Sequence, residues 1–175
     1  EYDLSQYKDY WIVKNEKQNW NYNAWYDNPY LSAYEKISAE LINKLNAAIT
    51  LNYQVTDWGK LVLRSGYDYY GNTQEQTNPM GIYGTRGGFS GYDNRGKYWT
   101  RKQDGFSTNN DLIFTAKKTF GDFGIDGLLG GAVFYRRNNT LTASTVNGLA
   151  IPGFYSLRNS VGPVSSVESK IKEMT

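Results

Sequence analysis

Apolar and polar residues alternate with a period of two along two long stretches of this chain, and each stretch is interrupted once by a tight turn. Between Lys44 and Val55 the odd positions are apolar or aromatic, and the even positions are polar except for Ala48. Such alternation indicates a strand with two different faces. The turn Thr56-Asp57-Trp58-Gly59 follows, and the alternation then resumes. The pattern predicts an antiparallel hairpin over residues 44–70.

The same pattern recurs further along the chain. Residues 111–118 read DLIFTAKK, the turn Phe120-Gly121-Asp122-Phe123-Gly124 follows, and residues 125–137 read IDGLLGGAVFYRR. The glycines of this last segment favour strong curvature or a close neighbour. The sequence therefore predicts a second antiparallel hairpin over residues 109–137.

A helix competes with the beginning of the first hairpin. Six residues between Leu31 and Ala48 recur at helical spacing: Leu31, Tyr34, Ile37, Leu41, Leu45 and Ala48. The stricter alternation from Lys44 onward favours a strand for that part. We expect residues 30–40 to form a loop that has room for one helical turn.

Long connections separate the two predicted hairpins from the rest of the chain. Residues 71–107 contain eight glycines and show no sustained periodicity. Connections of this length are uncommon and are usually functional or mobile. With further loops expected at 1–40 and 138–163, the hairpins have short turns at one end and long loops at the other.

The length of the predicted strands fits a membrane. Eleven residues span roughly 36 Å at about 3.3 Å each, which suits a strand tilted by about 45° across an apolar band of roughly 25 Å. Aromatic residues gather at both strand ends: Tyr53, Trp58, Phe120 and Phe123 near the turns, and Tyr67, Tyr69, Tyr70 and Tyr135 at the other end. We therefore expect transmembrane β-strands, and a soluble β-sandwich with a tyrosine-rich core stays open as the alternative.

Four strands are too few for a closed barrel. The smallest single-chain barrels have about eight strands, and lipid does not tolerate an open sheet edge. The expected fold class is therefore all-β, with antiparallel hairpins that form only part of a large transmembrane barrel. All of residues 1–175 are assigned to this one partial domain.

Composition removes several classes of function. The chain has no cysteine and no histidine, which excludes thiol nucleophiles, disulfides and the commonest general base. Its net charge of +2 and lack of a basic run predict no nucleic-acid partner. No signal peptide and no apolar run of helix-spanning length are recognised. The mean hydropathy of −0.64 is compatible with a barrel, because half of each strand faces a polar lumen.

Two segments invite a catalytic or nucleotide-binding interpretation. Residues 81–91, GIYGTRGGFSG, lack the Lys-Ser/Thr ending and the strand-to-helix context of a phosphate loop, so we expect a flexible loop. Glu75, Asp93 and Asp104 could form a glycosidase pair only at a defined separation, which the sequence does not establish, so we interpret them as solvated loop charges. We expect no enzymatic activity, no metal and no cofactor.

The strongest binding candidates are aromatic and cationic residues of the 71–107 segment. Rings stack on sugars and arginines hold acidic groups, although the same residues also pack a loop against itself or against a partner. The candidates are Tyr83, Arg86, Phe89, Tyr92, Arg95, Tyr98 and Trp99, with Trp99 the foremost.

Several short motifs, in order and spacing, resemble the SusC/RagA-type TonB-dependent receptors of Gram-negative outer membranes. They extend from Trp20 to about Ser169, and each is weakly specific when taken alone. They are Asp27-Asn28-Pro29-Tyr30; Thr56-Asp57-Trp58 with Leu61 and Gly66-Tyr67-Asp68-Tyr69-Tyr70; Phe120-Gly121-Asp122-Phe123 with Gly127-Leu128-Leu129-Gly130-Gly131; and Ile151-Pro152-Gly153-Phe154-Tyr155-Ser156-Leu157 with Asn159-Ser160.

The resemblance implies a barrel of about 22 strands in the bacterial outer membrane, of which this chain is an internal fragment. It implies TonB-dependent import of an oligosaccharide or a peptide together with a SusD-like surface lipoprotein, with TonB engaging parts outside these residues. The alternative function is a secreted, soluble all-β glycan-binding module. The last residues, 170–175, depart from the strand expected there, and the boundary after Ser169 is left open.

Overall fold

The computed structural model describes residues 3–21, 26–83 and 94–175. Five long strands dominate it: β3 (Ser38–Thr56), β4 (Gly59–Asn78), β5 (Lys97–Phe120), β6 (Phe123–Ser144) and β7 (Ser165–Met174). Two short strands, β1 (Trp11–Val13) and β2 (Lys17–Gln18), one α-helix, α1 (Pro29–Glu35), and the 3₁₀ turns Ser5–Tyr7 and Leu157–Asn159 complete the described part.

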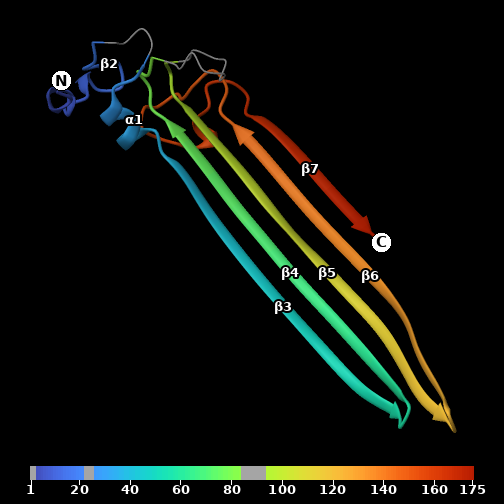
Figure 1. The fold of residues 1–175 in the computed structure, drawn as a ribbon. Helices are drawn as coiled ribbons and strands as arrows, with labels where there is room; N and C mark the ends of the chain where they lie inside the picture. The colour runs from blue at the N-terminus through green and yellow to red at the C-terminus, as the bar shows by residue number, and fades with distance from the viewer. Residues whose placement is uncertain (1–2, 22–25, 84–93) are drawn as a thin grey trace. The chain divides into compact units, whose positions relative to one another are not determined.

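The long strands form one antiparallel sheet in the order β3-β4-β5-β6-β7, so each strand pairs with its neighbour in sequence (Figure 1). The turn between β3 and β4 contains Asp57, and the turn between β5 and β6 contains Asp122. Gly121 has a φ of 58°, a left-handed conformation that glycine adopts without strain. The all-β fold class and both antiparallel hairpins are therefore confirmed.

The strands extend beyond the alternating segments, and this corrects the predicted loops. Most of 71–107 is strand, because β4 continues to Asn78 and β5 begins at Lys97. β3 and β6 likewise extend into 1–40 and 138–163. The added ends, such as TQEQTN at 73–78, are polar on both faces, so backbone pairing holds strands that hydrophobic periodicity does not mark.

Two further expectations, at the two ends of the sheet, are corrected. Residues 30–40 were expected to form a loop with room for one helical turn, but they contain most of α1, which ends at Glu35, and the start of β3 at Ser38. At the other end, residues 170–174, which were expected to depart from a strand, belong to β7. The residue after β7, Thr175, pairs with Phe134 of β6: each N–H donates to the other's carbonyl oxygen, at 2.9 and 3.0 Å.

The chain divides into two compact units. Unit 1 comprises residues 1–41, 73–102 and 141–168, and unit 2 comprises residues 42–72, 103–140 and 169–175. Among the described residues, the buried apolar side chains Tyr7, Leu31, Ala143 and Leu149 belong to unit 1, and Val62 alone belongs to unit 2. Unit 2 is thus a sheet without a core of its own.

Unit 1 is organised around Asn28, the residue before α1. Its side-chain oxygen accepts hydrogen bonds from the N–H groups of Tyr30 (2.8 Å) and Leu31 (3.4 Å), as a helix N-cap does. Its amide nitrogen donates to the carbonyl oxygens of Tyr7 and Asn19, at 3.0 and 2.8 Å. Asn28 is fully buried, so one side chain ties the helix to the chain that precedes it.

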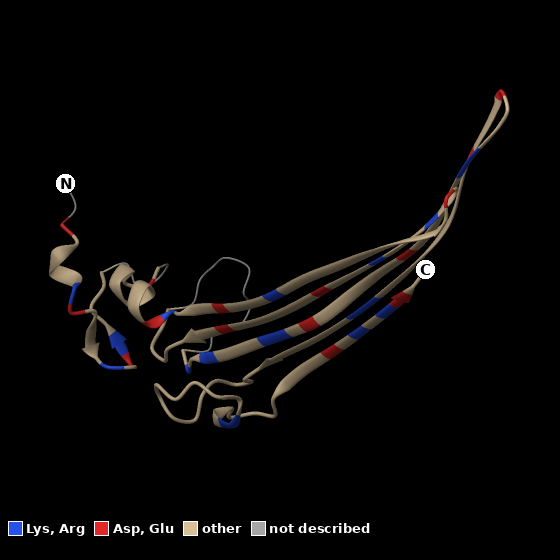
Figure 2. Ribbon diagram, turned by 90° about the horizontal axis from the view of Figure 1, so that it is seen from below, with Lys and Arg blue, Asp and Glu red and all other residues tan. Residues whose placement is uncertain are grey.

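Unit 2 has two chemically different faces. The face we call the apolar face carries leucine, isoleucine and valine residues that are strongly exposed, such as Leu51 (58%), Ile49 (64%) and Leu129 (76%). The opposite face, which we call the polar face, carries Lys44, Asn46 and other charged or amide side chains. Acidic and basic residues are interspersed along the long strands (Figure 2).

Candidate functional site

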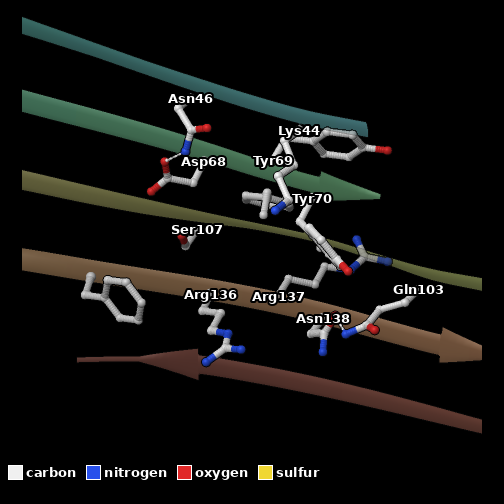
Figure 3. Close-up of a pocket in the computed structure, with 13 residues that line it drawn as sticks. Lys44, Asn46, Asp68, Tyr69, Tyr70, Gln103, Ser107, Arg136, Arg137 and Asn138 are labelled. Atoms are coloured by element: carbon white, nitrogen blue, oxygen red, sulfur yellow. Dashed lines mark hydrogen bonds between the residues drawn. The ribbon is translucent and has the colours of Figure 1, made fainter. Parts of the chain in front are cut away.

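A pocket of about 510 Å³ lies in unit 2 and draws on four neighbouring strands (Figure 3). Ten of its lining residues share the polar face by strand alternation: Lys44, Asn46, Asp68, Tyr70, Gln103, Gly105, Ser107, Phe134, Arg136 and Asn138. The remaining lining residues, Tyr69, Phe106 and Arg137, alternate to the apolar face.

The hairpin of β3 and β4 supplies one wall of the pocket. The amide of Asn46 donates a hydrogen bond to the carboxylate of Asp68 across the two strands, at 2.5 Å. The ammonium group of Lys44 lies 5.7 Å from the ring centre of Tyr70, within cation–π range. A carboxylate, an ammonium group and an aromatic ring are therefore held in fixed register on one wall.

The hairpin of β5 and β6 supplies the floor and the other wall. The amide of Gln103 donates to the side-chain oxygen of Asn138, at 3.4 Å. Between them, a Cβ at Gly105 would lie 2.7 Å from the carbonyl oxygen of Arg137 and 3.0 Å from the side chain of Asn138. Glycine is required for this close approach, and its missing side chain leaves the floor open.

The charge of the polar face within the pocket is positive. Lys44 and Arg136 contribute two cations, and Asp68 contributes the one carboxylate. Within the part of the chain that the structure describes, the guanidinium group of Arg136 has no carboxylate at ion-pair distance. An exposed, unpaired guanidinium beside amide and hydroxyl groups suits an anionic, hydroxyl-bearing ligand.

The apolar face of unit 2 carries a cross-strand row of aromatic rings. Phe106 lies between Tyr67 and Tyr135, with ring centres 5.8 Å and 5.6 Å apart, so the row crosses β4, β5 and β6. We call this the upper aromatic row. Aromatic pairs on a sheet face stabilise adjacent strands.

A second cluster of rings lies near the two hairpin turns. The rings of Trp58 and Phe114 meet edge to face at 6.4 Å, and Lys118 lies 5.7 Å and 5.0 Å from the ring centres of Trp58 and Phe120. We call this cluster the lower aromatic row. Exposed leucine, isoleucine and valine side chains fill the apolar face between the two rows.

The predicted binding residues that the structure describes do not line the pocket. Arg86, Phe89 and Tyr92 fall outside the described residues, and Tyr83, Arg95, Tyr98 and Trp99 belong to unit 1. Tyr98 and Trp99 lie in β5 rather than in a loop. None of these four lines the pocket.

Tyr98 has mainly structural contacts. Its hydroxyl donates to the carboxylate of Glu75 at 2.9 Å, and its N–H donates to the hydroxyl of Thr145 at 3.0 Å. Partial burial and the bond to Glu75 raise the pKa of Tyr98 above its ordinary value. Its hydroxyl is therefore already committed to a cross-strand bond.

Tyr83 joins a buried polar cluster of unit 1 through its backbone. Its N–H donates to the carboxylate of Asp27 at 2.6 Å, and that carboxylate also accepts from the amide of Gln18 at 2.7 Å. Lys36 forms an ion pair with Asp27, whose side chain is 1% exposed. These contacts fasten the chain around Gly81 to the segment before α1, and they leave Asp27 fully engaged.

The pocket residues were not among the candidates predicted from the sequence, although the hydrophobic alternation already placed several of them on one face. The polar positions of the alternating segments include Lys44, Asn46, Asp68 and Arg136. Strand register, which the sequence pattern leaves undetermined, is what brings them together.

Among the described residues, no helix is both long and apolar enough to cross a membrane, and no group of acidic side chains has the arrangement of a metal site. No protein-family model matches the chain, and no curated protein is similar enough to count as a relative.

Proposed function

We propose that this chain is part of the wall of an outer-membrane β-barrel, in a TonB-dependent receptor of the SusC/RagA type. In this proposal the complete receptor imports an oligosaccharide or a peptide together with a SusD-like surface lipoprotein. The chain contributes barrel wall and binding surface, and it has no catalytic role.

One observation carries the proposal: the apolar face of unit 2 is exposed between two aromatic rows. The nine steps from Trp58 to Tyr67 rise about 30 Å, or about 21 Å across a membrane at a tilt of about 45°. On β6, the twelve steps from its first residue, the exposed ring Phe123, to Tyr135 give about 28 Å in the same way. Both values bracket the apolar band of roughly 25 Å that aromatic girdles flank in such barrels.

The lack of a covering layer favours the membrane over the soluble module. A soluble sandwich buries the apolar face of one sheet against a second sheet. Unit 2 buries a single apolar side chain among its described residues, and the leucines on the apolar face of β3 and β6, Leu45, Leu51 and Leu129, are more than half exposed. Lipid covers such a face, and further strands pair with the outer edges of β3 and β7.

Residues 1–175 contain no cysteine, so an introduced cysteine is the one thiol in this part of the complete protein, and cysteines outside it are replaced by serine for the test. Single cysteines are introduced as Ile49→Cys on the apolar face and Asn52→Cys on the polar face of the complete protein in outer-membrane vesicles. We expect a membrane-impermeant maleimide to label Asn52→Cys at least tenfold faster than Ile49→Cys. Detergent solubilisation should remove that difference. Equal labelling of both cysteines in intact vesicles would favour the soluble module instead.

A further inference from the structure

The pocket on the polar face of unit 2 has the chemistry of a site for an acidic sugar. We infer that it binds a uronic acid unit of an oligosaccharide, with Arg136 receiving the carboxylate and Lys44 adding a second positive charge at the opposite wall. The inference rests on the proposed function, and it specifies the ligand class of the imported oligosaccharide.

The charge pattern supports a carboxylate-bearing ligand. Arg136 projects from β6 and Lys44 from β3, and the pocket extends between these strands (Figure 3). A guanidinium group binds a carboxylate through two parallel hydrogen bonds, which an ammonium group does not reproduce. Asp68, the one acidic side chain on this face of the pocket, already accepts a hydrogen bond from Asn46 and so repels an anion less.

The uncharged lining supports a sugar rather than a peptide. Amide and hydroxyl groups of Asn46, Gln103, Ser107 and Asn138 provide both donors and acceptors, which match the hydroxyl groups of a sugar ring. The ring of Tyr70 is a flat apolar surface against which the face of a sugar can lie. A volume of about 510 Å³ falls within the range of small-ligand sites.

Gly105 shapes the pocket for a ligand that lies against the backbone. Any side chain there would collide with the carbonyl oxygen of Arg137 and with Asn138. Its absence exposes the strand at the centre of the pocket, between the wall that carries Lys44 and the wall that carries Arg136. A sugar bound at Arg136 can lie against the strand only if this centre is open.

The test is binding to the purified complete protein, measured by isothermal titration calorimetry. The probes are the α-1,4-linked trisaccharide of galacturonic acid and the neutral galactose trisaccharide with the same linkage. We expect the acidic trisaccharide to bind at least tenfold more tightly. In Arg136→Gln this preference should fall to less than threefold while affinity for the neutral probe is kept, and Arg136→Lys should restore part of it.

Arg64→Gln is the matched control, because Arg64 lies on the polar face of β4 but does not line the pocket. This variant should keep the full preference. Thermal unfolding of every variant is measured in parallel, so that misfolded protein is not counted as loss of binding. Equal affinity for both trisaccharides, no binding of the acidic one, an unchanged preference in Arg136→Gln, or binding of an acidic dipeptide alone would overturn the inference.

The two proposals fail separately. If the cysteine labelling shows lipid contact but the acidic trisaccharide has no advantage, the site assignment fails and the barrel proposal stands. If Arg136 confers acid preference but both cysteines label equally in vesicles, the site stands in a protein that is not a membrane receptor.

Discussion

At the scale of single residues, unit 1 depends on polar side chains that are buried and fully bonded. Asn28 caps α1 and at the same time bonds to two carbonyl groups of the preceding chain. A buried amide with several partners is costly to remove, because those partners then lose their bonds away from water.

Replacing Asn28 by alanine should destabilise α1 and the chain that precedes it. Loss of the cap and of the buried bonds together should cost about 2–3 kcal/mol. Hydrogen–deuterium exchange of the amides in α1 measures the effect, and the protection should fall. Ser32→Ala on the same helix is the control and should change protection by less than about 0.5 kcal/mol. Unchanged protection in Asn28→Ala would contradict the capping role.

Tyr155 provides a test at alkaline pH. Burial, with a smaller contribution from the negative charge of Glu35, raises the pKa of Tyr155 to about 12. Because the folded pKa lies above the ordinary value of about 10, folding favours the neutral phenol. The associated stability is fully present below pH 10 and is lost as the pH rises toward 12.

Ultraviolet titration of the wild type and Tyr155→Phe isolates this group. The difference between the two curves should show one phenol with a midpoint near pH 12. The variant should also lose less stability than the wild type between pH 10 and pH 12. A midpoint near pH 10 would mean that Tyr155 is solvated.

At the scale of elements, the sequence predicts the strands that hydrophobic alternation marks, and it misses the strands and strand ends without such alternation. The alternation on either side of the turns at Asp57 and Asp122 was sufficient to predict both hairpins. The polar strand ends and β7 were missed, because backbone hydrogen bonds to a neighbouring strand carry no side-chain period. The pocket was missed for a related reason: it depends on which residues of four strands lie opposite one another.

The two faces of β3 should respond differently to charge. Ile49→Lys places an ammonium group on the apolar face, and in the proposed membrane barrel, near the middle of the bilayer, it should cost about 2–4 kcal/mol. Asn52→Lys on the polar face of the same strand should cost well under 1 kcal/mol. The free energy of unfolding of the complete barrel in lipid vesicles distinguishes them. Equal tolerance of the two lysines would refute the assignment of faces.

At the scale of the whole molecule, the connection between β4 and β5 is shorter than expected, spanning residues 79–96. Arg86, Phe89 and Tyr92 fall within it in sequence, and they remain candidates for contact with the ligand or the lipoprotein of the proposed receptor. Because β4 and β5 pair directly in the sheet, a change in this connection should affect ligand uptake without affecting assembly of the proposed barrel.

Replacing residues 84–93 with a short Gly-Ser linker in the complete receptor should reduce uptake of the imported nutrient while leaving surface expression unchanged. Growth on that nutrient and surface immunolabelling are measured in parallel. A Gly-Ser linker in place of residues 145–148 is the comparison for a replacement that disturbs the structure, because Thr145 and Gly148 bond or pack within unit 1. It should lower surface expression. Normal uptake after replacement of residues 84–93 would exclude Arg86, Phe89 and Tyr92 from ligand recognition.

The strict alternation of the long strands also limits how this chain can evolve. A single inserted residue at Gly66 would turn every later side chain of β4 to the other face. Asp68 and Tyr70 would leave the polar face, and Tyr67 and Tyr69 would take their positions on it. Insertions and deletions within these strands should therefore survive mainly in pairs, and single-residue length changes among homologous genes should accumulate only in the connections.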